Sequence, residues 1–231
     1  IGRVRQQLVA TGQERDTLVV FISDNGGPTM PGVTVNASSN RPLRGSKRTT
    51  LEGGIRVPFV LSWPGRVPPG VYAQPAIQLD LTCTALTAAG ITIQPDWKLD
   101  GTDLLPFISG AKSGAPHDAL YWRLGEQMAV RMGDFKLVRY DHNADTLTGR
   151  RNQGVTAPKL YHLRDDIGET RDLAAAMPEK ARELEARWTA WNAGNVAPLW
   201  SGGGGDNDGP APGSAADKQG KRAGRQQTKA K

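Results

Sequence analysis

Two apolar runs in the first third of the chain predict β-strands. Residues 17–22 are rich in β-branched side chains and are followed at once by polar residues and glycines, which predicts a buried strand. Residues 55–63 form a second run, in which Pro58 should lie near the strand's start or at a sheet edge because it cannot donate to a ladder. The Gly-, Pro- and Ser-rich segment 26–54 between them is too long for an idle connection, so we expect it to carry function.

The spacing of other apolar residues predicts helices. Residues 1–12 and 76–89 each carry an apolar stripe and end at a glycine, and residues 103–110 form one short helical segment. The segment 178–191 begins with a proline, which is common in the first turn of a helix. In the sequence, the first of these helices precedes the two predicted strands, the next two follow them, and the last lies nearer the C-terminus.

The segment 119–163 has a different character. It contains short stretches of partial apolar–polar alternation, which predict a small antiparallel sheet, and Gly133-Asp134 suits a hairpin turn between two of them. The helix predicted over 178–191 has one apolar stripe, so we expect it to cover this sheet. The stripe consists of Leu184, Trp188 and Trp191.

These elements predict an α/β protein with two folded parts and a tail. We expect residues 1–115 to be the C-terminal part of an α/β catalytic domain and residues 116–198 to be a small subdomain of antiparallel sheet plus helix. Residues 199–231 are of low complexity and predict a disordered basic tail. Because the chain begins without methionine, in a helix that leads straight into a strand, we expect it to be a fragment.

The net charge of +6 is concentrated near the C-terminus. Residues 214–231 carry +5, so the remainder is close to neutral at +1 and a basic binding face is not indicated. Cys83 is the only cysteine, which excludes an internal disulfide and a cysteine-rich metal site. The sequence has no apolar run of 18 residues, the length expected of a membrane-spanning helix.

Asp24 and Asn25 directly follow the first predicted strand. Ligands bind at the carboxyl ends of strands in open α/β sheets, and carboxylate and amide oxygens are hard donors suited to Ca²⁺ or Mg²⁺. The alternative is a simple turn, because Asn-Gly is a strong hairpin signal. No alternating return strand directly follows Gly27, which favours a site.

A second candidate is Lys47, in the segment 42–58. Gly45 and Ser46 leave backbone amides accessible next to it. The mobile ammonium group of Lys47 suits a phosphate-like or sulfate-like oxyanion. This segment therefore predicts an anion-binding position.

The other charged residues of this segment have simpler interpretations. We expect Arg44 and Arg48 to be solvated in a basic loop. Glu52 and Arg56 are four residues apart, so we expect them to pair and to fix the exit of the loop.

Several segments, in order and at the usual spacing, resemble the formylglycine-dependent sulfatases, an arylsulfatase-like family of the alkaline-phosphatase-like superfamily. The resemblance covers roughly residues 1–195, and its motifs are weak singly but specific together. They are Val19-Val-Phe-Ile-Ser-Asp-Asn-Gly-Gly, Pro42-Leu-Arg-Gly-Ser-Lys, Glu52-Gly-Gly-Ile-Arg-Val-Pro-Phe with Trp63-Pro-Gly, Leu99-Asp-Gly-Thr-Asp-Leu-Leu-Pro, and Leu160-Tyr-His-Leu-Arg-Asp-Asp-Ile-Gly-Glu-Thr-Arg-Asp-Leu.

The resemblance implies a site. Asp24 and Asn25 would be two ligands of one Ca²⁺ ion, and Lys47 would contact the sulfate group of the ester. The fold would be the C-terminal part of a mixed or parallel sheet sandwich of the alkaline-phosphatase type, plus the small antiparallel subdomain. The remaining metal ligands, the histidines near the sulfate and the nucleophile would belong to a preceding N-terminal part.

We assign no catalytic residue within this chain. The family makes its formylglycine nucleophile from Cys or Ser in a C/S-x-P/A-x-R motif, and Cys83 lacks the arginine, so we interpret it as a buried helix residue. We give no catalytic role to the histidines, which lie in the second subdomain. They are His117, His142 and His162.

The implied activity is hydrolysis of sulfate esters of sugars or aryl groups, in the periplasm or outside the cell, with the fragment alone inactive. A phosphoesterase or phosphonate hydrolase of the same superfamily is one alternative, which the segment around Lys47 and Glu52 disfavours. Another is a non-catalytic protein whose basic tail binds an anionic polymer. Residues 201–231 contain no aromatic side chain to stack on bases, so we do not expect nucleic acid as a partner, nor a membrane.

Overall fold

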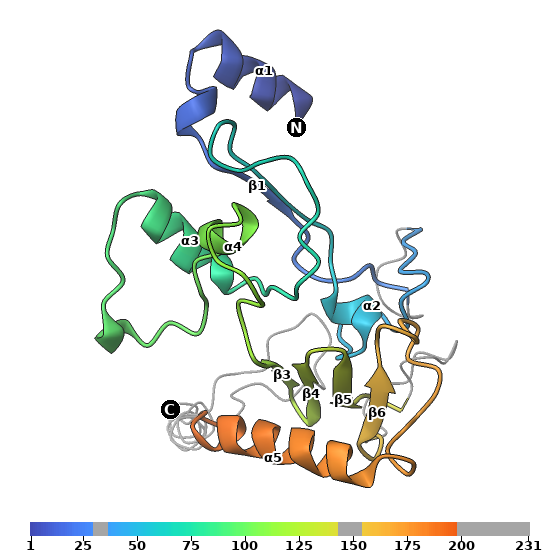
Figure 1. The fold of residues 1–231 in the computed structure, drawn as a ribbon. Coiled ribbons are helices and arrows are strands. Elements are labelled where there is room, and N and C mark those ends of the chain that lie inside the picture. The colour runs from blue at the N-terminus through green and yellow to red at the C-terminus, as the bar shows by residue number, and fades with distance from the viewer. Residues whose placement is uncertain (30–36, 143–153, 198–231) are drawn as a thin grey trace, which may run out of the picture.

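The computed structural model describes residues 1–29, 37–142 and 154–197, which contain two antiparallel sheets and several helices (Figure 1). One sheet has two strands and lies near the N-terminus, and the other has four. The α/β class predicted from the sequence is confirmed. The basic tail predicted over 199–231 lies outside the described residues.

The two-stranded sheet consists of β1 (Val19–Ile22) and β2 (Phe59–Ser62), paired antiparallel. Both predicted strands are confirmed, and Pro58 lies directly before β2. The prediction that β1 is buried is wrong: Phe21 faces Val60 across the pair, and they are 48% and 57% exposed. A sheet of two strands covers little apolar surface, so an apolar sequence here does not bring burial.

The predicted helical segments 1–12, 76–89 and 103–110 are each confirmed, whereas two short 3-10 helices near this sheet were not predicted. α1 (Gly2–Ala10) and the short η1 (Glu14–Asp16) precede β1. α3 (Asp80–Ala88) follows β2, and after η2 (Pro95–Trp97) comes the single turn α4 (Leu105–Ile108). The backbone N–H of the residue before α4 donates to a threonine hydroxyl of α3, which fixes the two helices side by side (Figure 1).

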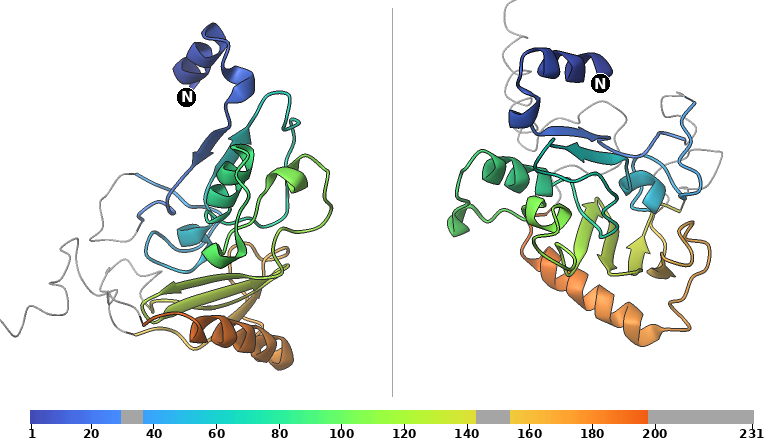
Figure 2. Two further views of the ribbon diagram at one scale, coloured as in Figure 1. Left: turned by 90° about the vertical axis from the view of Figure 1, so that its left-hand side faces the viewer. Right: turned by 45° about the horizontal axis from the view of Figure 1, so that its top comes forward.

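The larger sheet lies nearer the C-terminus, and its four strands pair antiparallel in chain order: β3 (Leu120–Leu124), β4 (Gln127–Met132), β5 (Phe135–Arg139) and β6 (Lys159–His162). Gly133, between β4 and β5, has a φ of +58°, as expected of the predicted hairpin turn. α5 (Pro178–Ala193) lies across one face of the sheet (Figures 1 and 2). The predicted helix-covered antiparallel sheet is therefore present.

The side chains of this sheet alternate between two faces, and each face has its own core cluster. The cluster under α5 consists of Met128, Val130, Leu137, Leu160 and Leu184. The cluster on the other face consists of Ala129, Val138, Tyr140, Tyr161 and Leu163, packed with Leu51. Since Leu51 directly precedes α2 (Glu52–Ile55), this short helix lies on the face opposite α5 (Figure 2).

The sheet thus connects the two halves of the sequence, because segment 42–56 packs on it. The domain boundaries at residues 115 and 198 stay predictions. Within the described parts of the chain, no helix is both long and apolar enough to cross a membrane.

Candidate functional site

Asp24 and Asn25 lie in a tight turn directly after β1. The Asn25 N–H donates to Asp24 Oδ1 over 2.9 Å, and the hydroxyl of Ser23 donates to the Asn25 carbonyl oxygen over 2.9 Å. The side-chain amide of Asn25 donates through Nδ2 to the Gly26 carbonyl oxygen at 2.9 Å, so its own Oδ1 is left as an acceptor. The turn therefore presents a carboxylate and an amide oxygen from adjacent residues.

Gly26 fixes this turn against α2. Its N–H donates to the carbonyl oxygen of Gly54 over 2.9 Å. A Cβ on Gly26 would lie 1.7 Å from the carbonyl oxygen of Gly53, so only glycine allows the two backbones to approach this closely. Asp24 and Asn25 can therefore form a turn and a site at the same time, because α2 holds the turn in place through Gly26.

The loop that carries Lys47 lies beside the same turn. The Lys47 N–H donates to the Gly27 carbonyl oxygen at 3.3 Å, and the buried hydroxyl of Ser46 also donates to it at 3.3 Å. Asn40 holds both segments, since its side chain bonds the N–H and carbonyl of Gly27 and the carbonyl of Gly45. The structure therefore brings the backbone of Lys47 against that of Gly27, which follows Asn25 by two residues and precedes Lys47 by twenty.

Two supporting side chains escaped the sequence interpretation. Asn40 is one, and Gln78, just before α3, is the other: its Nε2 donates to the carbonyl oxygens of Ser23 and Asp24, each at 2.9 Å. Both are amides in irregular segments, and such residues give no periodic signal. Their only signal is composition, because amides are common where loops need side-chain hydrogen bonds.

A buried charge cluster lies beneath the Lys47 loop. The ammonium of Lys136, on β5, lies 2.8 Å from Glu52 Oε1 and 2.9 Å from Glu169 Oε1, and all three residues are nearly inaccessible. Burial raises the pKa of Glu52, but attraction to Lys136, Arg131 and Arg56 more than offsets it and holds the pKa below its usual value. For Glu169, burial outweighs Lys136 and the pKa lies above its usual value.

The expected pairing of Glu52 with Arg56 is confirmed at 3.6 Å. The expectation that Arg44 is solvated is wrong. Its guanidinium donates to the Glu169 carbonyl oxygen at 2.7 Å and to the Tyr140 hydroxyl at 2.8 Å, and it lies over the Tyr140 ring. The sequence could not reveal this, because the partners follow Arg44 by about a hundred residues.

The donors at the turn suit a hard cation such as Ca²⁺. That ion takes 6–8 oxygen ligands, and Asp24 and Asn25 offer two from a turn whose backbone is held on three sides. Among the described residues, no group of three or more His, Cys, Asp or Glu is arranged to hold a metal. The turn fits part of a coordination shell, and the assignment of these two residues as ligands stays a prediction.

The sequence contains one match to the S-x-P-x-R pattern that the sequence interpretation overlooked, at Ser62-Trp-Pro-Gly-Arg66. Ser62 pairs with Val19 at one end of the two-stranded sheet, whereas Asp24 follows the other end. A strand advances about 3.4 Å per residue, so the length of the sheet separates this serine from the candidate site. We therefore give Ser62 no catalytic role.

Cys83 and two of the histidines make contacts within the fold, away from the candidate site. Cys83 is 2% exposed in α3 and its thiol donates to the Gly101 carbonyl oxygen, as expected of a buried helix residue. His117 lies 2.7 Å from the buried carboxylate of Asp80, and His162 pairs with a neighbouring aspartate in the loop after β6. The structure places neither histidine in contact with the turn at Asp24.

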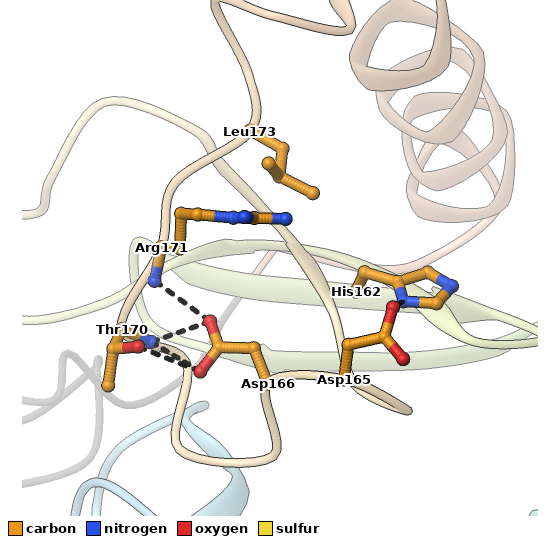
Figure 3. Close-up of a pocket in the computed structure, with 6 residues that line it drawn as sticks. All are labelled: His162, Asp165, Asp166, Thr170, Arg171 and Leu173. Atoms are coloured by element: carbon orange, nitrogen blue, oxygen red, sulfur yellow. Dashed lines mark hydrogen bonds and ion pairs between the residues drawn. The ribbon is translucent and has the colours of Figure 1, made fainter.

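A cavity of about 260 Å³ lies beside the loop after β6 (Figure 3). Hydrogen bonds from Thr170 and Arg171 occupy the Asp166 carboxylate and, despite burial, hold its pKa below the usual value. None of the three predicted site residues lines this cavity. The lining residues are His162, Asp165, Asp166, Thr170, Arg171 and Leu173.

Comparisons with known proteins find similarity to sulfatases. Residues 1–91 match the family model described as Sulfatase. The chain is 37% identical over 211 residues to the sulfatase YdeN of Escherichia coli K12 and 33% identical over 204 residues to human arylsulfatase A; each alignment covers 80% of this chain, but only 37% and 39% of the relative. The crystal structure of Ps i-CgsB is 27% identical with a TM-score of 0.71, covering 87% of this chain and 42% of that one.

The chain therefore spans less than half the length of the relatives that it matches. Its two-stranded sheet, its helix-covered antiparallel sheet and the loops between them follow the alkaline-phosphatase-like fold of these sulfatases. The family match, the curated relatives and the shared fold are together consistent with the sulfatase family.

Proposed function

We propose that the protein hydrolyses sulfate esters, with Asp24 and Asn25 holding a Ca²⁺ ion and Lys47 binding the sulfate group. One observation carries the proposal: the Lys47 N–H donates to the carbonyl oxygen of Gly27, two residues after Asn25. The cationic side chain of Lys47 and the two hard oxygen donors thus belong to backbone segments that lie next to each other. Similarity to the sulfatase family suggests a divalent metal, and the all-oxygen donor pair favours Ca²⁺.

The chain's own residues would bind and orient the ester. The ammonium of Lys47 neutralises charge on the sulfate oxygens, and this attraction grows as negative charge develops during bond cleavage. A bound divalent ion supplies further positive charge next to the same group. Asn40 and Ser46 hold the backbone of Gly27 and Gln78 holds that of Asp24 through hydrogen bonds, which keeps the site preorganised.

The substrate class follows from the relatives. Among them are an arylsulfatase and an N-acetylgalactosamine-6-sulfatase, and one solved neighbour is described in complex with k-i-k-neocarrahexaose. We infer that a sulfated carbohydrate or an aryl sulfate is the substrate of this protein as well.

The test measures sulfate release by the intact protein from an aryl sulfate and from sulfated oligosaccharides. Asp24→Ala, Asn25→Ala and Lys47→Ala should each lower kcat/KM by about 100-fold or more, the size of effect seen when one charge-stabilising donor is lost. Asp118→Ala and Lys112→Ala are matched controls, because both residues are exposed and lie outside the site. Wild-type rates in the three site variants would contradict the site, and faster hydrolysis of the matching phosphate esters would point to a phosphoesterase.

A further inference from the structure

Glu169, in the loop after β6, makes polar contacts with three residues that lie far from it in the sequence. Its Oε2 accepts the N–H of Glu52 at 2.7 Å, its Oε1 lies 2.9 Å from the Lys136 ammonium, and its carbonyl oxygen accepts a guanidinium hydrogen of Arg44 at 2.7 Å. The side chain is 0% exposed. Every polar group of Glu169 except its N–H therefore reaches another segment.

The side chain of Glu169 is connected to the turn at Asp24 through α2. The carboxylate fixes the N–H of Glu52, the first residue of α2. The next two residues of this helix form the surface on which the turn rests, because the Gly54 carbonyl accepts the Gly26 N–H and the Gly53 carbonyl lies against Gly26. A shift of α2 would therefore move the turn.

The main chain of Glu169 reaches the Lys47 loop by a second route. Its carbonyl oxygen holds the guanidinium of Arg44, three residues before Lys47. The carbonyl of Arg44 in turn accepts the N–H of Gly53 at 2.6 Å, so the two routes meet at α2. One residue of the second sheet's loop thus braces both parts of the candidate site.

The contacts of Glu169 come at an energetic cost. Its φ of +53° lies in the left-handed region, which costs about 1–3 kcal/mol for a residue with a side chain. Two carboxylates and one ammonium are buried together, an arrangement that apolar residues of similar size often replace without loss of stability. Stability alone therefore does not account for a glutamate at this position.

We propose that Glu169 is a positioning residue for the sulfate-ester site, which it braces through Glu52 and Arg44. This inference rests on the proposed function for its catalytic part, whereas its structural part concerns this chain's own backbone. The competing explanation is that Glu169 only joins the second sheet to the rest of the molecule. The two differ in where the structure loosens when the carboxylate is removed.

Amide hydrogen exchange in the intact protein distinguishes them. Glu169→Gly removes the carboxylate. Because glycine adopts a positive φ without strain, we expect this variant to fold. We expect the exchange rates at Gly26 and Lys47 to rise about tenfold or more, as for the loss of a hydrogen bond to a charged group, and those at Val130 and Leu137 in the sheet to rise less. Glu169→Gln, which keeps an acceptor for the Glu52 N–H, should stay within about threefold of wild type.

Activity supplies a second reading on the same variants. We expect kcat for sulfate release to fall in Glu169→Gly and to be restored largely in Glu169→Gln, while Glu185→Gln, at an ion pair on α5, leaves it unchanged. Equal rises in exchange at the site and in the sheet, or no rise at Gly26 and Lys47, would overturn the proposal. If the wild type releases no sulfate, the proposed function fails, and the exchange rates still decide the positioning role.

Discussion

The carbonyl oxygen of Gly53 occupies the position where a side chain on Gly26 would begin, with 1.7 Å between that oxygen and an ideal Cβ. The contact joins a turn after the first strand to a helix 27 residues later in the chain. It defines the geometry of the candidate site, since Asn25 directly precedes Gly26 and Lys47 lies on the loop leading into the same helix.

Gly26→Ala should therefore destabilise the protein by about 2 kcal/mol or more, because a methyl group forced into a filled space costs about 1–3 kcal/mol and here meets backbone that cannot rotate away. Denaturant unfolding of the variant measures this. Gly2→Ala is the control, since a Cβ there meets nothing within 4 Å. Equal stability of the two variants would show that α2 does not hold the turn.

Lys136→Met should be the most destabilising substitution in the charge cluster. It leaves Glu52 and Glu169 buried without their shared cation, and breaking a buried pair costs about 3–5 kcal/mol. Lys180→Met, at a surface pair on α5, should cost about 1 kcal/mol or less. Denaturant unfolding at neutral pH compares the two, and a loss below about 1 kcal/mol in Lys136→Met would contradict the buried arrangement.

Glu52 should make stability depend on pH on the acid side. Its pKa in the folded protein lies below the ordinary value of 4.5, so its stabilising contribution is complete above pH 4.5 and is lost as the pH falls through the folded value. Unfolding free energies of wild type and Glu52→Gln should therefore converge on acidification.

Glu169 should behave in the opposite way, since its raised pKa favours the protonated form and its contribution is lost as the pH rises. If the unfolding free energies of wild type, Glu52→Gln and Glu169→Gln changed in parallel with pH, these pKa shifts would be contradicted.

Calcium should stabilise the intact protein through Asp24 and Asn25. At 100 times its dissociation constant, a ligand that binds only the folded state adds about 2.7 kcal/mol, which thermal unfolding with and without a chelator would detect. The increment should vanish in Asp24→Ala and persist in Asp118→Ala. Persistence of the full increment in Asp24→Ala would place the ion elsewhere.

The sequence was sufficient to predict the local elements. Alternation and turn residues predicted β3 to β6 and the hairpin at Gly133, and the stripe with Leu184 predicted which helix covers the sheet. The juxtaposition of Lys47 with the turn came from a family resemblance rather than from periodicity. The missing return strand after Gly27 separated the turn from a tight hairpin, and β2, which pairs with β1, indeed begins only after 36 intervening residues.

Contacts at long range were beyond sequence reasoning. Arg44 reads as a solvated residue of a basic loop until Tyr140 and Glu169 are placed beside it. The apolar run of β1 predicts burial, yet Phe21 stays half exposed because burial depends on which elements cover the strand. The local pattern indicates which secondary structure a segment prefers, whereas its tertiary contacts follow only from the assembled fold.

The alternation of β5 gives the buried charges one more consequence. Lys136 shares its face with Val138 and reaches the carboxylates beneath α2, while Leu137 points to α5. A slip of β5 by one residue would turn Lys136 into the apolar layer under α5 and set Leu137 against two carboxylates. The ammonium group therefore disfavours a one-residue slip of β5 in either direction, because each such slip would bury unpaired charge.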